Sequence, residues 1–422
     1  MAVNLGELTL PDELPVIPDG WRYESLGDLV EDRGVSYGVV QPGSTTTDGV
    51  PIVRVNNIRN GRIDTTDMLK VGADIEARFQ RSRLRGGEVL LTLVGTLGEV
   101  AIVPDSLRGW NVARAVGVIP VRDDPGSLWV SICLRSAFIQ HCIRTWATTT
   151  VQATFNLRDL AKLPIPIPPV KTREAIAAVL GVLDDKIELN RRMNATLEAM
   201  ARALFQSWFV DFDPVRANQD GREPVGLDQA TADLFPETFE ETALGHVPNG
   251  WQVKSLGEVI ELAYGKPLKA EDRMHGPVCV YGANGPVGWH DEKLVSGPGI
   301  VIGRKGNPGV VTWAHGDFYP IDTTFYVDPI GACRSLYFLY YALSFHNLAN
   351  LSADSAVPGL NRNHAYMSKQ VIPSQPVLTA FDSQIAPIFA AMHANEEQSR
   401  SLALARDTLL PKLLSSELTV PL

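Results

Sequence analysis

Two long stretches of the chain place apolar residues at alternating steps of four and three, the spacing of a helical seam. The first stretch runs from residue 171 to about 209, and this period is typical of a coiled coil rather than of an ordinary core-facing helix. Its seam positions are Ile176, Leu180, Leu183, Ile187, Asn190, Asn194, Leu197, Ala201, Leu204 and Trp208.

The second stretch repeats the first, with every seam position 205 residues later. Its seam positions are Phe381, Ile385, Ile388, Met392, Asn395, Ser399, Leu402, Arg406, Leu409 and Leu413. Both seams turn polar near the middle, and polar seam residues cost stability while fixing register. Pro387 and Pro411 lack a backbone N–H, so each predicts a kink or an end of the second helix.

Two equal helices in one chain most simply pair with each other, although each could instead pack separately on its own globule. The pairing direction stays open at this point. An antiparallel pair would hold one globule at each end, whereas a parallel pair would place both globules at one end.

Short apolar runs bounded by turn residues surround the two helices and predict two mixed α/β globules. Strands are predicted at 51–55, 88–94 and 116–121 in the first globule and at 299–302 and 324–327 in the second. Helices are predicted at 127–146 and near 336–345. The proline-rich strip 164–169 closes the first globule, because prolines at this density continue neither a helix nor a central strand.

The chain also repeats short motifs, which indicates an internal duplication. Pro18-Asp19-Gly20-Trp21 returns as Pro248-Asn249-Gly250-Trp251, and the strip KLPIPIPP resembles the later KQVIPSQP. We therefore predict an α+β protein whose two pseudo-two-fold-related globules are joined by two long helices. Its predicted segments are 1–169 (with a loose arm at 1–17), a first helix at 170–210, a linker at 211–247, a second globule at 248–376 and a second helix at 377–422.

Composition and charge are those of a globular protein with an acidic excess. The chain has 38 basic and 48 acidic residues, a net charge of -10. The globules are nearly neutral, and the helices and connectors carry most of the acidity. Because phosphate neutralisation takes several Lys or Arg per site, we expect a more basic partner to supply part of any nucleic-acid affinity.

The four cysteines are scattered, and they predict neither a disulfide framework nor a zinc site. The acidic N-terminus does not resemble a signal peptide, and no apolar run reaches the length of a membrane span. We expect a cytoplasmic protein without membrane contact.

Sequence motifs for catalysis are missing. Gly303 to Gly309 lacks the GK[ST] step of a phosphate-binding loop, and Gly95-Thr96-Leu97-Gly98 is best interpreted as a hairpin turn. Asp211 and Asp213 lack further acidic ligands at useful spacing, which favours a turn or cap over a metal site. We predict no catalytic residue, no metal ligand and no cofactor in this chain.

Residues suited to reading DNA are better represented. Arg and Asn side chains match guanine and adenine edges, and arginines along an extended segment can follow phosphates. Each cluster could equally be a solvated polar rim. The candidate DNA-binding residues are Arg54, Asn56, Asn57, Arg59, Arg62, Arg81 and Arg83 in the first globule and Tyr264, Lys266, Asn284, Arg304, Lys305 and Asn307 in the second. Asn60, Arg78 and Arg85 lie among the first group.

The helical stretches and the second globule resemble the specificity subunits of type I restriction-modification systems. The resemblance rests on 197–215 (LEAMARALFQSWFVDFDPV), on Pro168-Pro169, on 406–415 (RDTLLPKLLS), and on 280–285 (VYGANG) with 302–306 (IGRKG). One departure is Glu174-Ala175, where the family often has Glu-Gln.

The resemblance implies two target-recognition domains on an antiparallel helical spacer. The partners would be double-stranded DNA, two methyltransferase subunits and restriction subunits that translocate DNA. S-adenosylmethionine, ATP and magnesium would then belong to those partners. The chain would read the halves of a bipartite site about one helical turn apart, with the helices setting the gap. The alternatives are a self-contained DNA-modifying or DNA-cleaving enzyme and a protein-binding scaffold without a DNA role.

Overall fold

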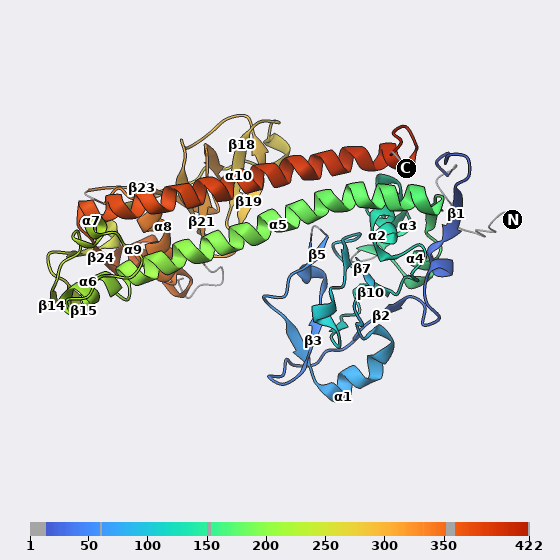
Figure 1. Cartoon of the computed structure of the whole chain (residues 1–422), viewed down its shortest axis with the longest axis horizontal. Coiled ribbons are helices and arrows are strands. Elements are labelled where there is room, and N and C mark those ends of the chain that lie inside the picture. Colours follow the sequence, from blue (N-terminus) through green and yellow to red (C-terminus); the bar gives the residue numbers. More distant parts are fainter. Residues whose placement is uncertain (1–13, 60, 150–152, 332, 352–358, 421–422) are drawn as a thin grey trace. The chain divides into compact units, whose positions relative to one another are not determined.

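The computed structural model describes residues 14–59, 61–149, 153–331, 333–351 and 359–420, so most of the arm expected at 1–17 lies outside it. The chain forms two units. One contains the residues up to Glu188 and those from Ser399, and the other is Leu189–Gln398. Two helices, α5 (Val170–Phe209) and α10 (Gln375–Leu414), each run through both units (Figure 1). Each unit therefore combines one globule with a segment of each long helix.

The first globule is built from three principal sheets. A four-stranded antiparallel sheet has the order β2 (Ser36–Tyr37), β10 (Val116–Ile119), β7 (Val89–Thr92), β8 (Val100–Ile102). A three-stranded sheet has the order β6 (Leu69–Val71), β3 (Val50–Val53), β9 (Asn111–Val112), with β3 and β9 parallel. The third pairs β1 (Arg22–Ser25) with the proline-rich β13 (Pro164–Ile167).

The second globule repeats all three sheets in the same order. Its four-stranded sheet is β17 (Ile260–Tyr264), β23 (Thr324–Pro329), β20 (Gly299–Gly303), β21 (Val311–Ala314). Its three-stranded sheet is β19 (Gly285–His290), β18 (Val278–Gly282), β22 (Phe318–Pro320), again with one parallel pair. Strand β16 (Gln252–Ser255) pairs with β24 (Lys369–Ile372). The two globules therefore share one topology, as the internal duplication predicts.

The remaining elements are short and connect or cover these sheets. The helices are α1 (Ala73–Glu76), α2 (Ser127–Leu134), α3 (Ala137–Trp146), α4 (Leu157–Ala161), α6 (Asp213–Gln219), α7 (Gln229–Ala232), α8 (Leu336–Phe345) and α9 (Arg362–Met367). Three hairpins are β4 (Ile58–Arg59) with β5 (Arg62–Ile63), β11 (Thr148–Thr149) with β12 (Ala153–Thr154), and β14 (Phe239–Thr242) with β15 (Gly245–Pro248). Short 3₁₀ turns include η2 (Val55–Asn57) and η3 (Ala77–Ser82).

The single helix predicted at 127–146 is two helices, α2 and α3. The chain is extended at Ser136, whose side-chain oxygen accepts a hydrogen bond from the Ile139 backbone N–H and so caps α3. Serine is a strong N-cap residue, because its oxygen satisfies a backbone donor that the first turn of a helix leaves open. This local signal outweighs the continuous apolar pattern on which the prediction rested.

The long helices pair antiparallel in the second unit. The C-terminal part of α5 meets the N-terminal part of α10, where the Trp208 and Phe381 rings lie 5.8 Å apart. Further along, Asn194 Nδ2 donates to the Met392 carbonyl at 2.9 Å, and Asn190 Nδ2 donates to Gln398 Oε1 at 2.9 Å. Residue numbers therefore rise along one helix as they fall along the other.

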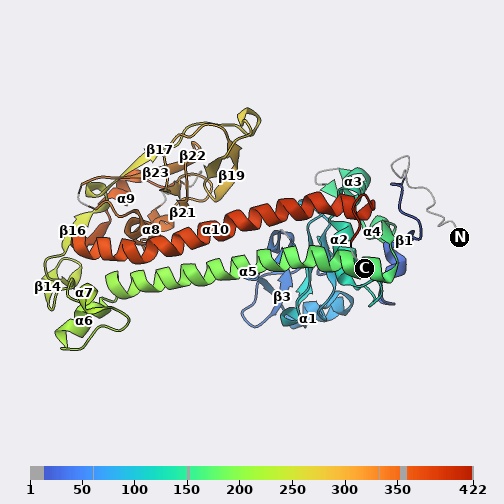
Figure 2. The ribbon, with the colours of Figure 1, turned by 45° about the horizontal axis from the view of Figure 1, so that its top comes forward.

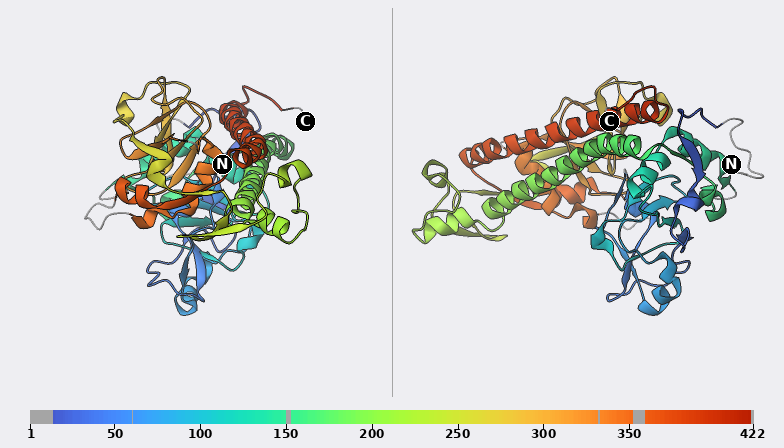
Figure 3. Two further views of the ribbon diagram at one scale, coloured as in Figure 1. Left: turned by 90° about the vertical axis from the view of Figure 1, so that its left-hand side faces the viewer. Right: turned by 45° about the vertical axis from the view of Figure 1, so that its right-hand side comes forward.

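The same antiparallel pairing holds in the first unit. Ile176 and Leu180 near the start of α5 share one buried cluster with Leu410 and Leu413 near the end of α10. Asp184 on α5 accepts a hydrogen bond from Arg406 Nη1 at 2.6 Å. Figures 1 and 2 show the two helices side by side along their length, and an end-on view shows them adjacent (Figure 3). The predicted fold class, including its antiparallel coiled coil, is thereby confirmed.

The predicted seam residues all lie on the protected side of the helices. The buried ones are Ile176, Leu180, Asn190, Ala201, Trp208, Phe381, Ile385 and Leu413. The partly buried ones are Leu183, Ile187, Asn194, Leu197, Leu204, Ile388, Met392, Asn395, Ser399, Leu402, Arg406 and Leu409. Helix α10 continues through Pro387 and Pro411, and both side chains are exposed. The helix ends three residues after Pro411, so neither proline ends it where it stands.

The segment predicted as a linker, 211–247, carries structure of its own. It contains α6, α7 and strand β14, and Val215, Phe235 and Val247 are buried in the core of the second unit. Its acidic, Gly- and Pro-rich composition concealed these few apolar anchors. The described part of the segment is therefore packed onto the second unit at the end of α5.

We predict that Phe205→Ala strongly destabilises the second unit. The Phe205 ring is 1% exposed and lies 5.3–6.2 Å from the rings of Phe209, Phe338, Tyr341, Phe345 and Phe381. Removing a buried aromatic ring costs about 3–5 kcal/mol. Hydrogen exchange followed by mass spectrometry should show faster exchange in α8 and the adjoining part of α5.

The matched control is Met200→Ala, which truncates a side chain that is 55% exposed on the same helix. An exposed truncation should change stability by no more than about 0.5 kcal/mol. Equal exchange rates in the two variants would contradict the importance of the aromatic cluster.

Candidate nucleic-acid interface

In the second globule the structure gathers the predicted DNA-binding residues at one edge of the sheets. Tyr264 ends β17, Asn284 follows β18, and Arg304 and Lys305 follow β20. Lys266 N donates to the carbonyl of Pro320, the last residue of β22, at 3.1 Å, and Arg304 Nη1 donates to the carbonyl of Asp322, two residues further on, at 3.1 Å. All of these side chains therefore belong to one group of neighbouring loops.

Tyr264 contacts two arginines. The guanidinium carbon of Arg304 is 4.9 Å from the centre of the Tyr264 ring, and that of Arg362 is 5.2 Å from it. The tyrosine remains 51% exposed. Cation–π contacts of this kind hold the guanidinium groups in place. The sequence pattern did not indicate Arg362, because this residue lies almost a hundred positions after Tyr264. It is the first residue of α9, and the fold brings this end of the helix to Tyr264.

Glycines fix the shape of the loop between β20 and β21. A side chain at Gly303 would come within 2.2 Å of the Asn307 carbonyl oxygen, and Gly309 has a φ of +84°. Asn307 Nδ2 donates to Asn284 Oδ1, which joins this loop to the one after β18. Leu360 N donates to the Arg304 carbonyl at 2.9 Å. Backbone contacts therefore fix the conformation of this loop. We call the loop and the strand ends that it contacts the frame, because they carry the exposed side chains.

The first globule builds the same frame from different residues. Gly98 N donates to the Thr92 carbonyl just as Gly309 N donates to that of Gly303. Leu93 takes the place of Arg304, because its carbonyl accepts from Phe155 N at 2.8 Å. The turn Gly95-Thr96-Leu97-Gly98 and the loop Gly306-Asn307-Pro308-Gly309 are therefore equivalent hairpin loops in the two copies.

Two polar side chains occur at matching places in both frames. Tyr37 in β2 stands opposite Gly117 as Tyr264 in β17 stands opposite Phe325, and the two tyrosines are 46% and 51% exposed. Asn56 and Asn284 each occupy the third position after the equivalent residues Val53 and Tyr281. At the other places the chemistry differs. Val39, Val94 and Thr96 stand where the second globule has Lys266, Lys305 and Asn307.

The structure does not bring the predicted residues of the first globule into one cluster. Asn57 is buried, and its amide is used within its own loop. Its Oδ1 accepts from Arg54 N at 3.0 Å, and its Nδ2 donates to the Asp64 and Asp67 carbonyls. Arg54 Nη2 lies 3.0 Å from Asp67 Oδ2. Asn57 and Arg54 therefore shape this loop, while Asn56 beside them is exposed.

Arg59 and Arg62 lie on the β4–β5 hairpin. This hairpin is a separate small sheet and does not include β2, the strand that carries Tyr37. Arg62 Nε lies 2.8 Å from Glu188 Oε2 on α5, and Arg59 is exposed. Asn60, between them, lies outside the described residues. The hairpin is thus attached to the long helix in the first unit.

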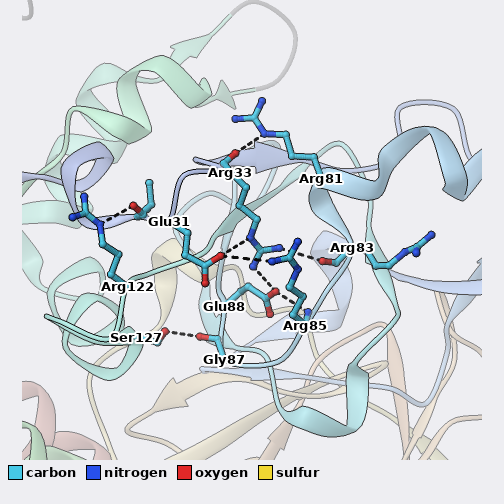
Figure 4. A network of polar contacts seen from close by, with 10 residues as sticks. Glu31, Arg33, Arg81, Arg83, Arg85, Gly87, Glu88, Arg122 and Ser127 are labelled. Atoms are coloured by element: carbon cyan, nitrogen blue, oxygen red, sulfur yellow. Dashed lines mark hydrogen bonds and ion pairs between the residues drawn. The ribbon is translucent and has the colours of Figure 1, made fainter.

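Of the arginines expected to follow phosphates, Arg81 and Arg85 lie beside a polar network that centres on Arg33 (Figure 4), and Arg85 Nη1 is 4.0 Å from Glu31 Oε2. Arg33 Nη2 donates to the buried Glu88 at 2.7 Å and Arg33 Nε to Glu31 at 3.0 Å. Arg81 Nε donates to the Arg33 carbonyl at 2.6 Å. Partly neutralised arginines attract phosphates less than free ones, so this face offers a weaker field than the sequence indicates.

Arg83 makes a two-pronged ion pair with Glu76, whose side chain is 3% exposed. Asn111 Nδ2 also donates to Glu76 Oε1 at 3.0 Å. These hydrogen bonds, that from Arg83 foremost, lower the pKa of the Glu76 carboxyl below its usual value. Glu76 therefore links α1 to Arg83, directly after η3, and to Asn111 of strand β9.

The carboxylates Asp211 and Asp213 occupy the turn between α5 and α6. Asp213 starts α6, and its Oδ2 accepts a hydrogen bond from Ser207 Oγ at 2.7 Å. Arg216 Nε donates to the Asp211 carbonyl at 2.9 Å. All four cysteines are free. Within the part of the chain that the structure describes, every helix is too short or too polar to cross a bilayer.

Comparisons with known proteins give a consistent result. Residues 18–199 match the type I restriction modification DNA specificity domain. The type I restriction enzyme HindI specificity subunit of Haemophilus influenzae is 29% identical over 339 residues, covering 64% of this chain and 72% of the relative. The EcoBI specificity subunit of Escherichia coli is 31% identical over 199 residues, covering 44% and 42%.

A solved structure has the same fold. The crystal structure of a type I restriction-modification S subunit from M. genitalium aligns with a TM-score of 0.52 at 17% identity. The alignment covers 95% of this chain and 97% of that one. The likeness extends over both units and both long helices.

We predict that Arg83→Gln destabilises the first unit in a pH-dependent way. The folded state lowers the pKa of Glu76, so the ion pair adds stability above the unfolded-state pKa of about 4.5 and loses it as the pH falls. The difference between wild type and variant should be about 1–3 kcal/mol at neutral pH and should shrink below about pH 4.5. Denaturant unfolding across this pH range measures it.

Arg78→Gln is the control, because Arg78 is exposed on the same 3₁₀ segment. Its effect should be small at every pH. A difference for Arg83→Gln that stays constant down to pH 3 would contradict the assigned ion pair.

Proposed function

We propose that the chain is a specificity subunit of a type I restriction-modification system and that its two globules each read one half of a bipartite double-stranded DNA site, which the matches to this family support. Members of this family are the non-catalytic, sequence-reading part of an enzyme complex. The observation that carries the proposal is the repeated frame, which displays different side chains at equivalent positions in the two globules. One frame with two sets of side chains is suited to two different half-sites.

The proposed reading edge of the second globule contains Tyr264, Asn284, Arg304, Lys305 and Asn307. Arginine reads guanine and asparagine reads adenine through paired hydrogen bonds in the major groove. The exposed Tyr264 ring holds the Arg304 and Arg362 guanidinium groups through cation–π contacts. Positively charged groups at this edge also suit phosphate contacts, which orient a protein on DNA.

The proposed reading edge of the first globule is centred on Tyr37 and Asn56, with Arg114 beside them. Arg114 N donates to the Val39 carbonyl at 2.9 Å, and the Arg114 side chain is exposed. Arg114 stands where the second globule has Asp322. Arg59, Arg78 and Arg85, also exposed, are proposed as phosphate contacts rather than as base readers.

The long helices are proposed to bind two methyltransferase subunits, with restriction subunits joining the complex. Helix α5 exposes an apolar stripe at helical spacing, formed by Val182, Leu189, Met193 and Met200, which are 42–66% exposed. Contiguous exposed apolar side chains mark protein-binding surfaces. S-adenosylmethionine, ATP and magnesium would then be bound by the partners, and the helix length would set the gap between half-sites.

We predict that substitutions at the two reading edges act on separate half-sites. Tyr264→Ala and Asn284→Ala should relax the sequence requirement in one half-site, while Tyr37→Ala and Asn56→Ala should relax it in the other. Each base contact contributes about 1–3 kcal/mol of discrimination. The measurement is methylation of duplexes mutated in either half-site, by the complex with its methyltransferase subunits, using the motif methylated in the host genome.

The matched control is Arg222→Ala, an exposed residue of the segment between α6 and α7 that pairs with Asp220 at 2.7 Å. It should leave both half-sites unchanged. Equal losses at both half-sites from one edge variant would contradict divided reading. Turnover of DNA by the purified chain alone would favour a self-contained enzyme, and unchanged DNA binding by the complex without this chain would favour a protein scaffold.

We predict that Leu189→Glu combined with Met193→Glu weakens binding of the methyltransferase subunits. Charges on an apolar contact surface must be desolvated without a partner, so we expect at least a tenfold weaker association, or about 1.4 kcal/mol. Sedimentation of the purified chain with the methyltransferase subunits measures the effect. Leu404→Glu, 69% exposed on α10, is the control outside the stripe, and an equal loss in both variants would contradict a specific role for the stripe.

A further inference from the structure

Strand β21 and helix α10 are held together by an aromatic contact in the second unit. The rings of Trp313 on β21 and Phe389 on α10 lie 4.8 Å apart at an angle of 70°, and Tyr337 of α8 stacks on Trp313 at 5.0 Å. These rings are buried or partly buried. Figure 2 shows β21 and α8 lying along α10. The backbones of the strand and the helix are therefore fixed relative to each other at this point.

Three side chains of types that can bind a metal ion lie next to this contact. His315 directly follows the last residue of β21, and its ring lies 6.3 Å from the ring of Phe389. His393 and Glu396 come four and seven residues after Phe389, so all three share one face of α10. The donor atoms of His315, His393 and Glu396 all lie within 4.8 Å of one another.

The cluster brings its donors together in a shielded place. The two imidazole rings stack 4.7 Å apart at an angle of 14°, and His315 Nε2 lies 3.7 Å from Glu396 Oε2. The His315 side chain is 15% exposed and that of Glu396 is 51% exposed. One flank is therefore closed by protein and the other opens to solvent, where water molecules could complete a coordination sphere.

We propose that His315, His393 and Glu396 form a binding site for a divalent transition metal of the zinc type. Two imidazoles and one carboxylate are a common protein ligand set for Zn²⁺, with bonds of about 2.0–2.2 Å. Donors around such an ion lie about 3.3 Å apart, so the present separations must shorten. Rotation about the second side-chain torsion of histidine is soft, which allows the stacked rings to turn their nitrogens towards a common point.

A metal at this place would join the edge strand of the second globule's four-stranded sheet to α10. His315 follows the strand β21, and the other two ligands belong to the helix, so the ion would connect two elements that are otherwise joined here by ring packing. A bound ion would stabilise the folded second unit in proportion to its affinity and concentration. The sequence concealed this site, because His315 and His393 are far apart in the chain and no cysteine accompanies them.

The test is Zn²⁺ binding by the full-length, untagged chain after removal of metal with a chelator. Isothermal titration calorimetry should show one Zn²⁺ per chain, and the ion should raise the unfolding temperature. His393→Gln and Glu396→Gln should each weaken binding by at least about tenfold. Co²⁺ in place of Zn²⁺ should give visible d–d absorption without a thiolate-to-cobalt charge-transfer band, which separates this site from the cysteines.

His141→Gln is the control, because His141 is an exposed histidine of the first unit. It should leave binding unchanged, and near-ultraviolet circular dichroism should show that every variant is folded. Absence of stoichiometric binding to the wild type would overturn the proposal. So would binding that persists at full strength in His393→Gln and Glu396→Gln, which would assign the ion to another site. Neither result depends on DNA recognition.

Discussion

The antiparallel register of α5 against α10 is the constraint on which both units depend. In the second unit the register is held by aromatic rings, with Phe205, Trp208 and Phe381 in one buried cluster. In the first unit it is held by Asp184, which accepts hydrogen bonds from Arg135 of the first globule and from Arg406 of α10. Between these ends, asparagines bond across the helices, as when Asn395 Nδ2 donates to Asn194 Oδ1 at 2.8 Å. An apolar seam tolerates sliding by one heptad, whereas these polar bonds are satisfied in only one register.

The two globules present different side chains on one backbone topology. Their sheets have the same strand order, and several backbone hydrogen bonds around the β7–β8 loop have counterparts around the β20–β21 loop. The side chains on that backbone differ in charge, since the second globule has Arg304 and Lys305 where the first has Leu93 and Val94. The near-neutral charge of each globule is compatible with the proposal that companion subunits contribute to DNA affinity.

The order of globules and helices could be predicted from the sequence, because it produces periodic seam positions and repeated motifs. The strict seam predicted both helices, and the duplicated motifs predicted twin globules. In the second globule, loops rich in glycine indicated the residues that the structure gathers around Tyr264. The match between Tyr37 and Tyr264 was also available, but the offset between the copies drifts from 230 residues at the PDGW motif to 205 in the seams, which obscures single positions.

Partners within the chain could not be predicted. The pattern of Arg81, Arg83 and Arg85 indicated a phosphate-binding strip, yet Arg83 pairs with Glu76 and Arg81 with a backbone carbonyl. Asn57 looked like a base reader, and the structure uses its amide to close a loop. Tertiary packing decides whether a polar group faces solvent or a buried partner. Local composition gives no information on that packing.

The glycine frame of the β20–β21 loop has a further consequence for how such a protein can change. Gly303 and Gly309 leave no space for a side chain, so substitution there would distort the loop. At Gly306, between them, no atom of another part of the chain lies within 4 Å of the place that a methyl group would occupy, and the neighbouring Lys305 and Asn307 are not buried in the core. Mutation of Lys305 should therefore change the surface of the loop at little cost in folding free energy, whereas mutation of Asn307 would also remove its hydrogen bond to Asn284. Side chains at this loop can thus vary between relatives while the backbone underneath stays the same.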